Sequence, residues 1–231
     1  MQIALSTQPF HSLKQVFLTA ALLWTGVATA AVDTNSAAAK LSDLLNQMNS
    51  MQAAFTQTTQ PTKKNKIPVK ISRGLRSNIA SQTFTGSMIV KRPGLFRWET
   101  QSPMNQLIIG NGKTIWIYDQ DLMQATRQTV DAQVANTPAL LLSGQTDQII
   151  KNFKITQTAA GNSFTLRPLS KDSVFESLQL DFESDKLSKL ILADALGQKT
   201  SISFSQSKLN GSIADSQFKF TPPKGVDIID Q

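Results

Sequence analysis

The chain has 231 residues, with 23 Lys and Arg against 16 Asp and Glu, no cysteine and a single histidine, His11. The absence of cysteine excludes a disulfide framework, a thiolate nucleophile, a cysteine metal site and a lipidated N-terminal cysteine. His11 falls in a segment that we expect to be removed, so no imidazole remains for general-base catalysis or metal binding. These exclusions argue against an enzyme, and we expect no catalytic residue, metal or cofactor.

Residues 1–30 have the pattern of a cleaved secretory signal. Lys14 precedes an apolar segment from Val16 to Val27, and Ala28-Thr29-Ala30 then gives the small–x–small sequence read by signal peptidase. The apolar segment is shorter than the roughly 20 residues that a helix needs to span a bilayer, although an uncleaved anchor is the alternative. We therefore expect an exported domain of residues 31–231 without a permanent membrane anchor.

An amphipathic helix is predicted from Ala37 onward. Its apolar side chains recur at i, i+3, i+4 and i+7, opposite Ser, Asp, Asn and Gln, and the stripe continues beyond two turns. These side chains are Leu41, Leu44, Leu45, Met48, Met51 and Phe55. Such a helix needs a sheet or a cavity rim to cover.

The segment Pro61–Ala80 is rich in lysine and carries prolines, which predicts an exposed loop. It lies within a longer stretch, from Leu44 to Trp98, that has no acidic residue. A basic face attracts nucleic acid, anionic lipid or an acidic partner, and a plain solvated loop is the alternative. Export argues against nucleic acid as the partner.

Most of the remaining chain predicts antiparallel strands. Two apolar runs flank Asn111-Gly112, the dipeptide that favours a type I′ hairpin turn. Other strands are expected at 83–91, 95–100, 122–130, 153–158, 163–167, 176–183, 187–193 and 199–206, with short helices at 132–142 and 147–152. The total is about ten strands, with an acidic tail from Asp227 to Gln231 and the helices gathered on one side of the sheet.

The stretch from Gly86 to Tyr118 has more apolar residues than a one-sided sheet would bury. We expect both faces of these strands to be away from water. Either a second layer covers the other face, or that face lines a cavity. Ordinary core packing explains each residue singly, but together they favour a concave lipid or small-molecule site under helices. These residues are Met88, Val90, Phe96, Trp98, Leu107, Ile109, Trp116 and Tyr118.

Two catalytic patterns are present only in part. Gly112-Lys113-Thr114 resembles the end of a phosphate loop, but the glycine required five residues earlier is Leu107, and a strand follows instead of a helix. Asp181 and Glu183 could be a glycosidase pair, yet alternation along a half-exposed strand explains both carboxylates.

Several blocks of the sequence resemble the LolA family of periplasmic lipoprotein carriers. They are Gly86-Ser-Met-Ile-Val-Lys-Arg-Pro-Gly-Leu-Phe-Arg-Trp98, Asn111-Gly-Lys-Thr-Ile-Trp-Ile-Tyr118, Asn136-Thr-Pro138 and Phe218-Lys-Phe-Thr-Pro-Pro-Lys-Gly-Val226. The resemblance implies an unclosed antiparallel β-barrel of eleven strands, with a helical lid over an apolar cavity. It also implies a monomeric carrier that takes lipoproteins from the inner-membrane transporter LolCDE to the outer-membrane receptor LolB.

The same resemblance implies roles for particular residues. Arg92 corresponds to the arginine that latches the lid, and Phe96 to an aromatic residue near the opening. The helix around Pro138, with Leu140 and Leu141, would form part of the lid and of the acyl-chain site. The chain departs from the family at Pro61–Ala80, which is longer and more basic. A sensor module that detects lipoproteins with the same half-barrel is the alternative function, and the missing cysteine counts against a receptor like LolB.

Overall fold

A computed structural model describes residues 34–61, 82–130, 142–144, 146–171, 173 and 175–231. The chain divides into residues 1–31 and a second unit, Val32–Gln231, and all described residues belong to the second. The predicted signal at 1–30, nearly all of the basic segment Pro61–Ala80 and the expected helix at 132–142, apart from its last residue, lie outside the described residues.

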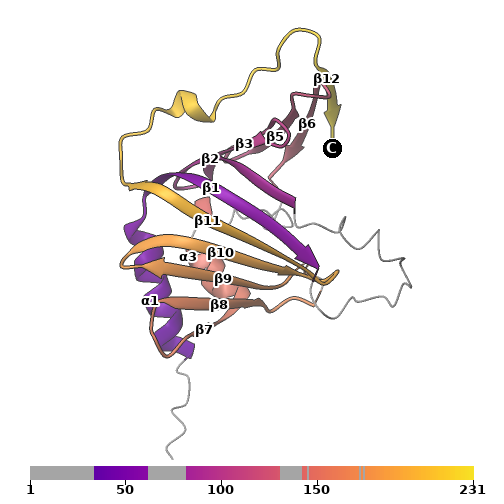
Figure 1. The fold of residues 1–231 in the computed structure, drawn as a ribbon. Helices are drawn as coiled ribbons and strands as arrows, with labels where there is room; N and C mark the ends of the chain where they lie inside the picture. The colour runs from indigo at the N-terminus through magenta and orange to yellow at the C-terminus, as the bar shows by residue number, and fades with distance from the viewer. Residues whose placement is uncertain (1–33, 62–81, 131–141, 145, 172, 174) are drawn as a thin grey trace, which may run out of the picture. The chain divides into compact units, whose positions relative to one another are not determined.

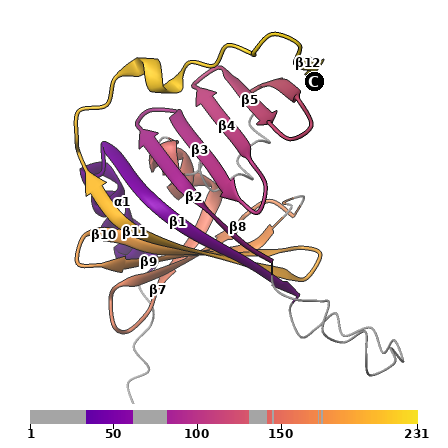
Figure 2. The same cartoon turned by 45° about the horizontal axis from the view of Figure 1, so that its top comes forward.

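The described strands form one sheet, in the order β12-β6-β5-β4-β3-β2-β1-β11-β10-β9-β8-β7 (Figure 1). Their bounds are β1 Ser50–Pro61, β2 Gln82–Lys91, β3 Leu95–Ser102, β4 Gln106–Asn111, β5 Thr114–Asp119, β6 Gln124–Thr129, β7 Phe153–Gln157, β8 Ser163–Pro168, β9 Phe175–Glu183, β10 Lys186–Asp194, β11 Gln198–Leu209 and β12 Asp227–Asp230. The sheet curls strongly, but its edge strands β12 and β7 do not pair with each other, so it remains an open barrel (Figure 2). The predicted mainly β, unclosed architecture is confirmed.

The C-terminal tail differs from the sequence-based expectation. Residues predicted as an acidic tail form β12, which pairs in parallel with β6 from Asp227 opposite Gln124 to Asp230 opposite Arg127. All other strand pairs are antiparallel. The sheet therefore has twelve described strands instead of ten or eleven. β12 supplies hydrogen-bond partners to β6, which would otherwise be an open edge.

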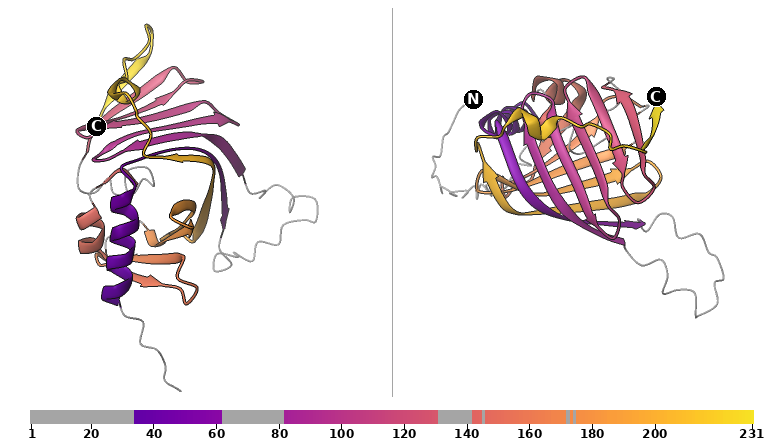
Figure 3. Two further views of the ribbon diagram at one scale, coloured as in Figure 1. Left: turned by 90° about the vertical axis from the view of Figure 1, so that its left-hand side faces the viewer. Right: turned by 90° about the horizontal axis from the view of Figure 1, so that it is seen from above.

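Two helices lie on one face of the sheet, α1 Thr34–Gln47 and α3 Thr146–Asn152 (Figure 3). The predicted helix was too long at its C-terminal end, since Met51 and Phe55 belong to β1. Asn210, at the end of β11, explains the boundary: its Nδ2 donates to the carbonyl of Gln47 at 2.8 Å. Its Oδ1 accepts from the backbone N–H of Asn49 at 2.9 Å, so helix end and strand start are fixed together.

The main core lies between the helices and the sheet face that they cover, which we call the inner face. Leu41 and Leu45 of α1 and Ile149 of α3 are buried there. From the sheet, alternate residues of most strands reach the same cluster, for example Phe164 of β8 and Leu190 of β10. This period-two pattern is the one expected of strands with one face in a core.

The hairpin between β4 and β5 forms as predicted, but its turn is different. A type I′ turn needs φ > 0 at both central residues, and of the predicted pair only Gly112 has it, at 87°. The Asn111 side chain instead accepts from the backbone N–H groups of Lys113 and Thr114, at 3.0 and 2.8 Å. Asn111 shapes the turn through its carboxamide oxygen instead of its backbone.

Candidate functional site

The eight residues predicted to line one apolar surface are not brought together. Directly opposed residues of neighbouring strands share a sheet face. Met88 is opposite Trp98, and Val90 is opposite Phe96. All four are buried in the main cluster on the inner face.

The other four residues lie on the opposite face of the sheet, which we call the outer face. Leu107 is opposite Tyr118, and Ile109 is opposite Trp116. Together with Ala125 they form a second, separate cluster. The sequence left open whether the second apolar face is covered by another layer or lines a cavity. On β4 and β5 it is covered by another layer.

Four aromatic rings and a glycine shape the inner face. Trp98 stacks on Phe55 with ring centroids 4.2 Å apart, and its other neighbour, Phe204, meets it edge-on at 6.5 Å. Phe96 lies across Gly110, where an added Cβ would come within 2.1 Å of the Phe96 ring. Phe55 and Phe204 were not among the predicted site residues; they lie opposite each other on β1 and β11, and no short spacing in the sequence links them.

The C-terminal segment covers the outer face. Phe220 lies 5.3 Å from both Trp116 and Tyr118, measured between ring centroids. The guanidinium of Arg127 lies 5.6 Å from the centroid of Trp116 and also binds the carboxylate of Asp230, with contacts of 2.6 and 2.9 Å. This cover therefore combines aromatic contact, an ion pair and the β12–β6 hydrogen bonds.

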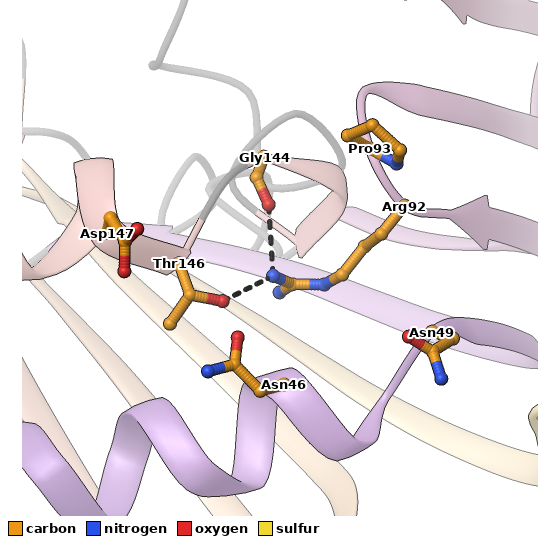
Figure 4. Close-up of a pocket in the computed structure, with 7 residues that line it drawn as sticks. All are labelled: Asn46, Asn49, Arg92, Pro93, Gly144, Thr146 and Asp147. Carbon is orange, nitrogen blue, oxygen red and sulfur yellow. Dashed lines mark hydrogen bonds between the residues drawn. The ribbon is translucent and has the colours of Figure 1, made fainter.

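The Lys91-Arg92-Pro93 corner joins the sheet to the segment that precedes α3. Nη1 of Arg92 donates to the Gly144 carbonyl at 2.9 Å and to Oγ1 of Thr146 at 2.8 Å (Figure 4). The backbone N–H of Gly94 also donates to the Ser143 carbonyl, at 2.7 Å. Three hydrogen bonds thus hold this segment against the end of β2.

The predicted lid residues Pro138, Leu140 and Leu141 lie outside the described residues. The residue that follows them, Leu142, is fully buried in the inner-face cluster. The segment that Arg92 holds therefore begins with a side chain in the same buried cluster as Met88, Val90, Phe96 and Trp98.

Burial without a counter-charge makes Arg92 unusual. Burial lowers the pKa of the Arg92 guanidinium to about 10, because an apolar environment disfavours the charged form. Its Nε and Nη2 atoms are buried and find no hydrogen-bond partner among the described residues. Beside the guanidinium is a polar pocket of about 380 Å³. It is lined by Asn46, Asn49, Arg92, Pro93, Gly144, Thr146 and Asp147.

Lys91 holds the C-terminal segment from the other side of the same corner. Its Nζ donates to the Ile213 carbonyl at 3.1 Å and to the carboxylate of Asp215 at 2.6 Å. That hydrogen bond and the charge of Lys91 lower the pKa of Asp215. Sequence reasoning missed this contact, since 124 positions separate the two residues.

Within the described part of the chain, no group of three His, Cys, Asp or Glu side chains could hold a metal ion. A search of the same residues finds no helix with the length and apolar character to cross a membrane.

Comparison with known proteins gives a consistent family. The family described as outer membrane lipoprotein carrier protein LolA matches residues 46–221. The outer-membrane lipoprotein carrier protein of Pseudomonas paraeruginosa is 38% identical over 221 residues, covering 95% of this chain and 99% of that protein. Its counterpart in Azotobacter vinelandii is 39% identical over 194 residues, covering 83% and 87%.

A solved structure supports the fold alone. An uncharacterized conserved protein from Thermus thermophilus is 13% identical with a TM-score of 0.50, covering 85% of this chain and 99% of that one. The matching family consists of carriers, not enzymes, in agreement with the expectation from the sequence. The chain belongs to the LolA family of outer membrane lipoprotein carrier proteins.

Proposed function

We propose that this protein is a periplasmic carrier that shelters the acyl chains of lipoproteins between the inner face of its sheet and the overlying helices. It would receive lipoproteins from the inner-membrane transporter LolCDE and deliver them to the outer-membrane receptor LolB. The observation that carries the proposal is an apolar inner face closed by a segment that a few polar hydrogen bonds hold in place. The names of relatives 38–39% identical support the choice of lipoproteins as cargo.

The inner face offers the chemistry that acyl chains need. Met88, Val90, Phe96 and Trp98 are almost completely buried, so acyl chains reach them only when the helical cover moves away. Each buried CH₂ group contributes about 0.8 kcal/mol, so one long chain gains on the order of 10 kcal/mol by leaving water. Leu140 and Leu141, outside the described residues, stay predicted contacts on the lid side.

The Arg92 latch suits a carrier that must also release its cargo. Hydrogen bonds to a charged group contribute about 1.5–3 kcal/mol each, and burying the guanidinium without a counter-charge offsets part of that gain. The closed state is therefore only modestly favoured. Acyl chains can displace the cover, and the recovery of the Arg92 contacts helps to expel the chains at the receptor.

The energy needed to extract a lipoprotein from a membrane points to a partner protein. No nucleotide-binding motif occurs in the sequence, so the energy for extracting a lipoprotein from a membrane must come from a partner such as LolCDE. We expect a monomer, because a shuttle has to present the same surface to its donor and its acceptor in turn.

Native mass spectrometry of the protein purified from the periplasm, after co-expression with a lipoprotein, tests the proposal directly. We expect a 1:1 complex whose mass includes the acyl chains. The matched control is the same lipoprotein with its acylated cysteine replaced, which should give no complex.

A reconstituted transfer assay tests the partners. Lipoprotein in LolCDE vesicles should appear in the protein only when ATP is present, and it should then pass to LolB. A protein that forms no complex with acylated lipoprotein is not a carrier. One that binds but does not exchange with LolCDE and LolB has other partners.

A further inference from the structure

Large apolar side chains that are exposed gather at one end of the sheet. Seven such residues occur in the described chain: Met104, Leu122, Met123, Leu169, Leu196, Ile228 and Ile229. The first five lie on the β3–β4, β5–β6, β8–β9 and β10–β11 connections, and the last two lie on β12. None of the described turns at the opposite end carries one. We call the five connection residues the tip surface.

Strand register shows that these connections share one end. Pro61, the last residue of β1, is opposite Gln198, the first residue of β11. The backbone N–H of Gln120 donates to the carbonyl of Asn105 at 3.1 Å, which joins the β3–β4 and β5–β6 turns. Figure 2 shows all four connections on the same side, while the corner after β2 lies on the other.

Hydrogen bonds hold the backbone of two of the turns that carry these exposed leucines. Leu122 is 71% exposed, Leu196 is 74% exposed and Leu169 is 63% exposed. The carboxylate of Asp119 accepts from the backbone N–H of Leu122 at 3.0 Å. That of Asp194 accepts from the N–H of the residue that begins β11, at 2.7 Å. These leucines contribute little to the core and are exposed enough to contact another surface.

The sequence supplies positive charge at the same end. Residues 62–81, outside the described residues, connect the end of β1 to the start of β2 and contain six Lys and Arg but no Asp or Glu. These cations outnumber the carboxylates of the neighbouring described turns. The carboxylates are Asp119, Asp121, Asp194 and Asp227. The net charge favours an anionic partner.

We propose that the tip surface enters the interfacial region of an anionic phospholipid bilayer during transient contact. The apolar side chains stand on separate turns along a curved sheet end. A protein partner would need a continuous patch of about 1,000 Å² or more, whereas a bilayer accepts separate side chains at headgroup depth. Lys and Arg near the surface would add attraction to anionic headgroups. The proposed carrier function supplies the reason for meeting membranes, but the contact itself needs no cargo.

The absence of cysteine in the natural sequence allows a direct test with single labels. Leu122→Cys and Leu196→Cys, each labelled with the environment-sensitive dye NBD, report on the tip surface. Asn162→Cys and Asp185→Cys are matched controls on turns at the opposite end. With vesicles of phosphatidylethanolamine and phosphatidylglycerol, we expect about a twofold rise and a blue shift at the two tip positions alone.

Equal signals at both ends, or no signal at any position, would overturn the proposal, and the latter would favour an acidic protein as the partner. Salt and vesicles of phosphatidylcholine alone should reduce the tip signal. In a second measurement, the double variant Leu122→Ser/Leu196→Ser should lose about tenfold in vesicle partitioning. The same variant should still form the 1:1 lipoprotein complex, so failure of membrane contact is distinguishable from failure of the carrier function.

Discussion

The two faces of β3, β4 and β5 carry similar numbers of apolar side chains but are covered in different ways. On the inner face, Trp98 and Phe96 belong to the same buried cluster as side chains of α1 and α3, and Arg92 holds the segment before α3 through two uncharged acceptors. On the outer face, Trp116 and Tyr118 meet Phe220, and an ion pair and a β-strand fix the covering segment.

This difference assigns the two faces different tasks. Strand pairing and the ion pairs of Lys91 and Arg127 join the outer cover to the sheet. We expect this cover to stay in place when the inner face opens. The segment before α3 is held at one corner of the sheet by three hydrogen bonds without an ion pair, so we expect it to open more readily. The apolar excess read from the sequence is therefore covered by the C-terminal segment on the outer side, and we propose that it binds acyl chains on the inner side.

The largest expected effect comes from the two tryptophans, which lie on opposite faces. Trp98→Ala should lower the free energy of unfolding by about 4 kcal/mol, and Trp116→Ala, which is only partly buried, by about 2 kcal/mol. Chemical denaturation measures both values. Only the Trp98 change should also weaken binding of an acylated peptide.

Tryptophan fluorescence compares the inner and outer faces with conservative Trp→Phe changes in place of Trp→Ala. From Ala31 onward, Trp98 and Trp116 are the two tryptophans. An acylated peptide with brominated chains should quench the Trp116→Phe variant, which retains Trp98, more than the Trp98→Phe variant. Equal quenching would contradict the assignment of acyl chains to the inner face.

A smaller effect is expected from Gly110, which lies under the Phe96 ring. Gly110→Ala should lower the free energy of unfolding by about 2 kcal/mol, because the new methyl group forces the ring to move in a packed core. Gly211→Ala is the matched control, since an added Cβ there meets nothing within 4 Å. Thermal unfolding of the two variants in parallel measures the difference, and equal midpoints would show that Phe96 is loosely packed.

Opening the inner cover at its latch should affect transfer more than stability. Arg92→Leu should leave a folded protein that accepts lipoprotein but delivers about tenfold less of it, equivalent to about 1.4 kcal/mol. The Gly94–Ser143 hydrogen bond remains and limits the loss. Arg127→Leu, which loosens the outer cover instead, is the control. Normal delivery by the Arg92 variant in the LolB transfer assay would refute the latch.

The smallest expected effect is a pH dependence confined to the outer cover. The pKa values of Asp215 and Asp230 are lowered from 3.8, each mainly by a hydrogen bond from its cationic partner. Both contacts should therefore be complete above pH 3.8 and weaken as the pH falls through the lowered values. The inner latch accepts through a carbonyl and a hydroxyl, so acid leaves it unchanged.

Trp116 fluorescence in the Trp98→Phe background follows this acid transition. Asp215→Asn with Asp230→Asn should abolish it, and high salt should reduce it because both pairs are exposed. A transition that persists in the double variant would have to be assigned to other carboxylates.

Much of the architecture was predictable from local patterns. Alternation placed Leu178, Leu180 and Phe182 on one face of β9, and Asp147–Asn152 was correctly expected as a short helix. The helix boundary at Gln47 was not predictable, because Asn210, more than 160 residues away in sequence, fixes it. The division of the apolar residues between two faces was also not predicted. Nearly continuous apolar runs lack the alternation with polar residues that would show which side chains share a face.

Residue types and short spacings were enough to predict a strand-rich domain, to show that no cysteine and no histidine beyond residue 30 occur, and to identify the blocks that resemble the LolA family. Those features depend on residue type and short spacing, which act locally. The folded chain was needed to show that β12 pairs with the edge of β6, that Phe220 covers Trp116, and that Lys91 and Arg92 hold different segments from one corner. Such contacts join residues far apart in the chain, and their geometry depends on the curvature and register of the whole sheet.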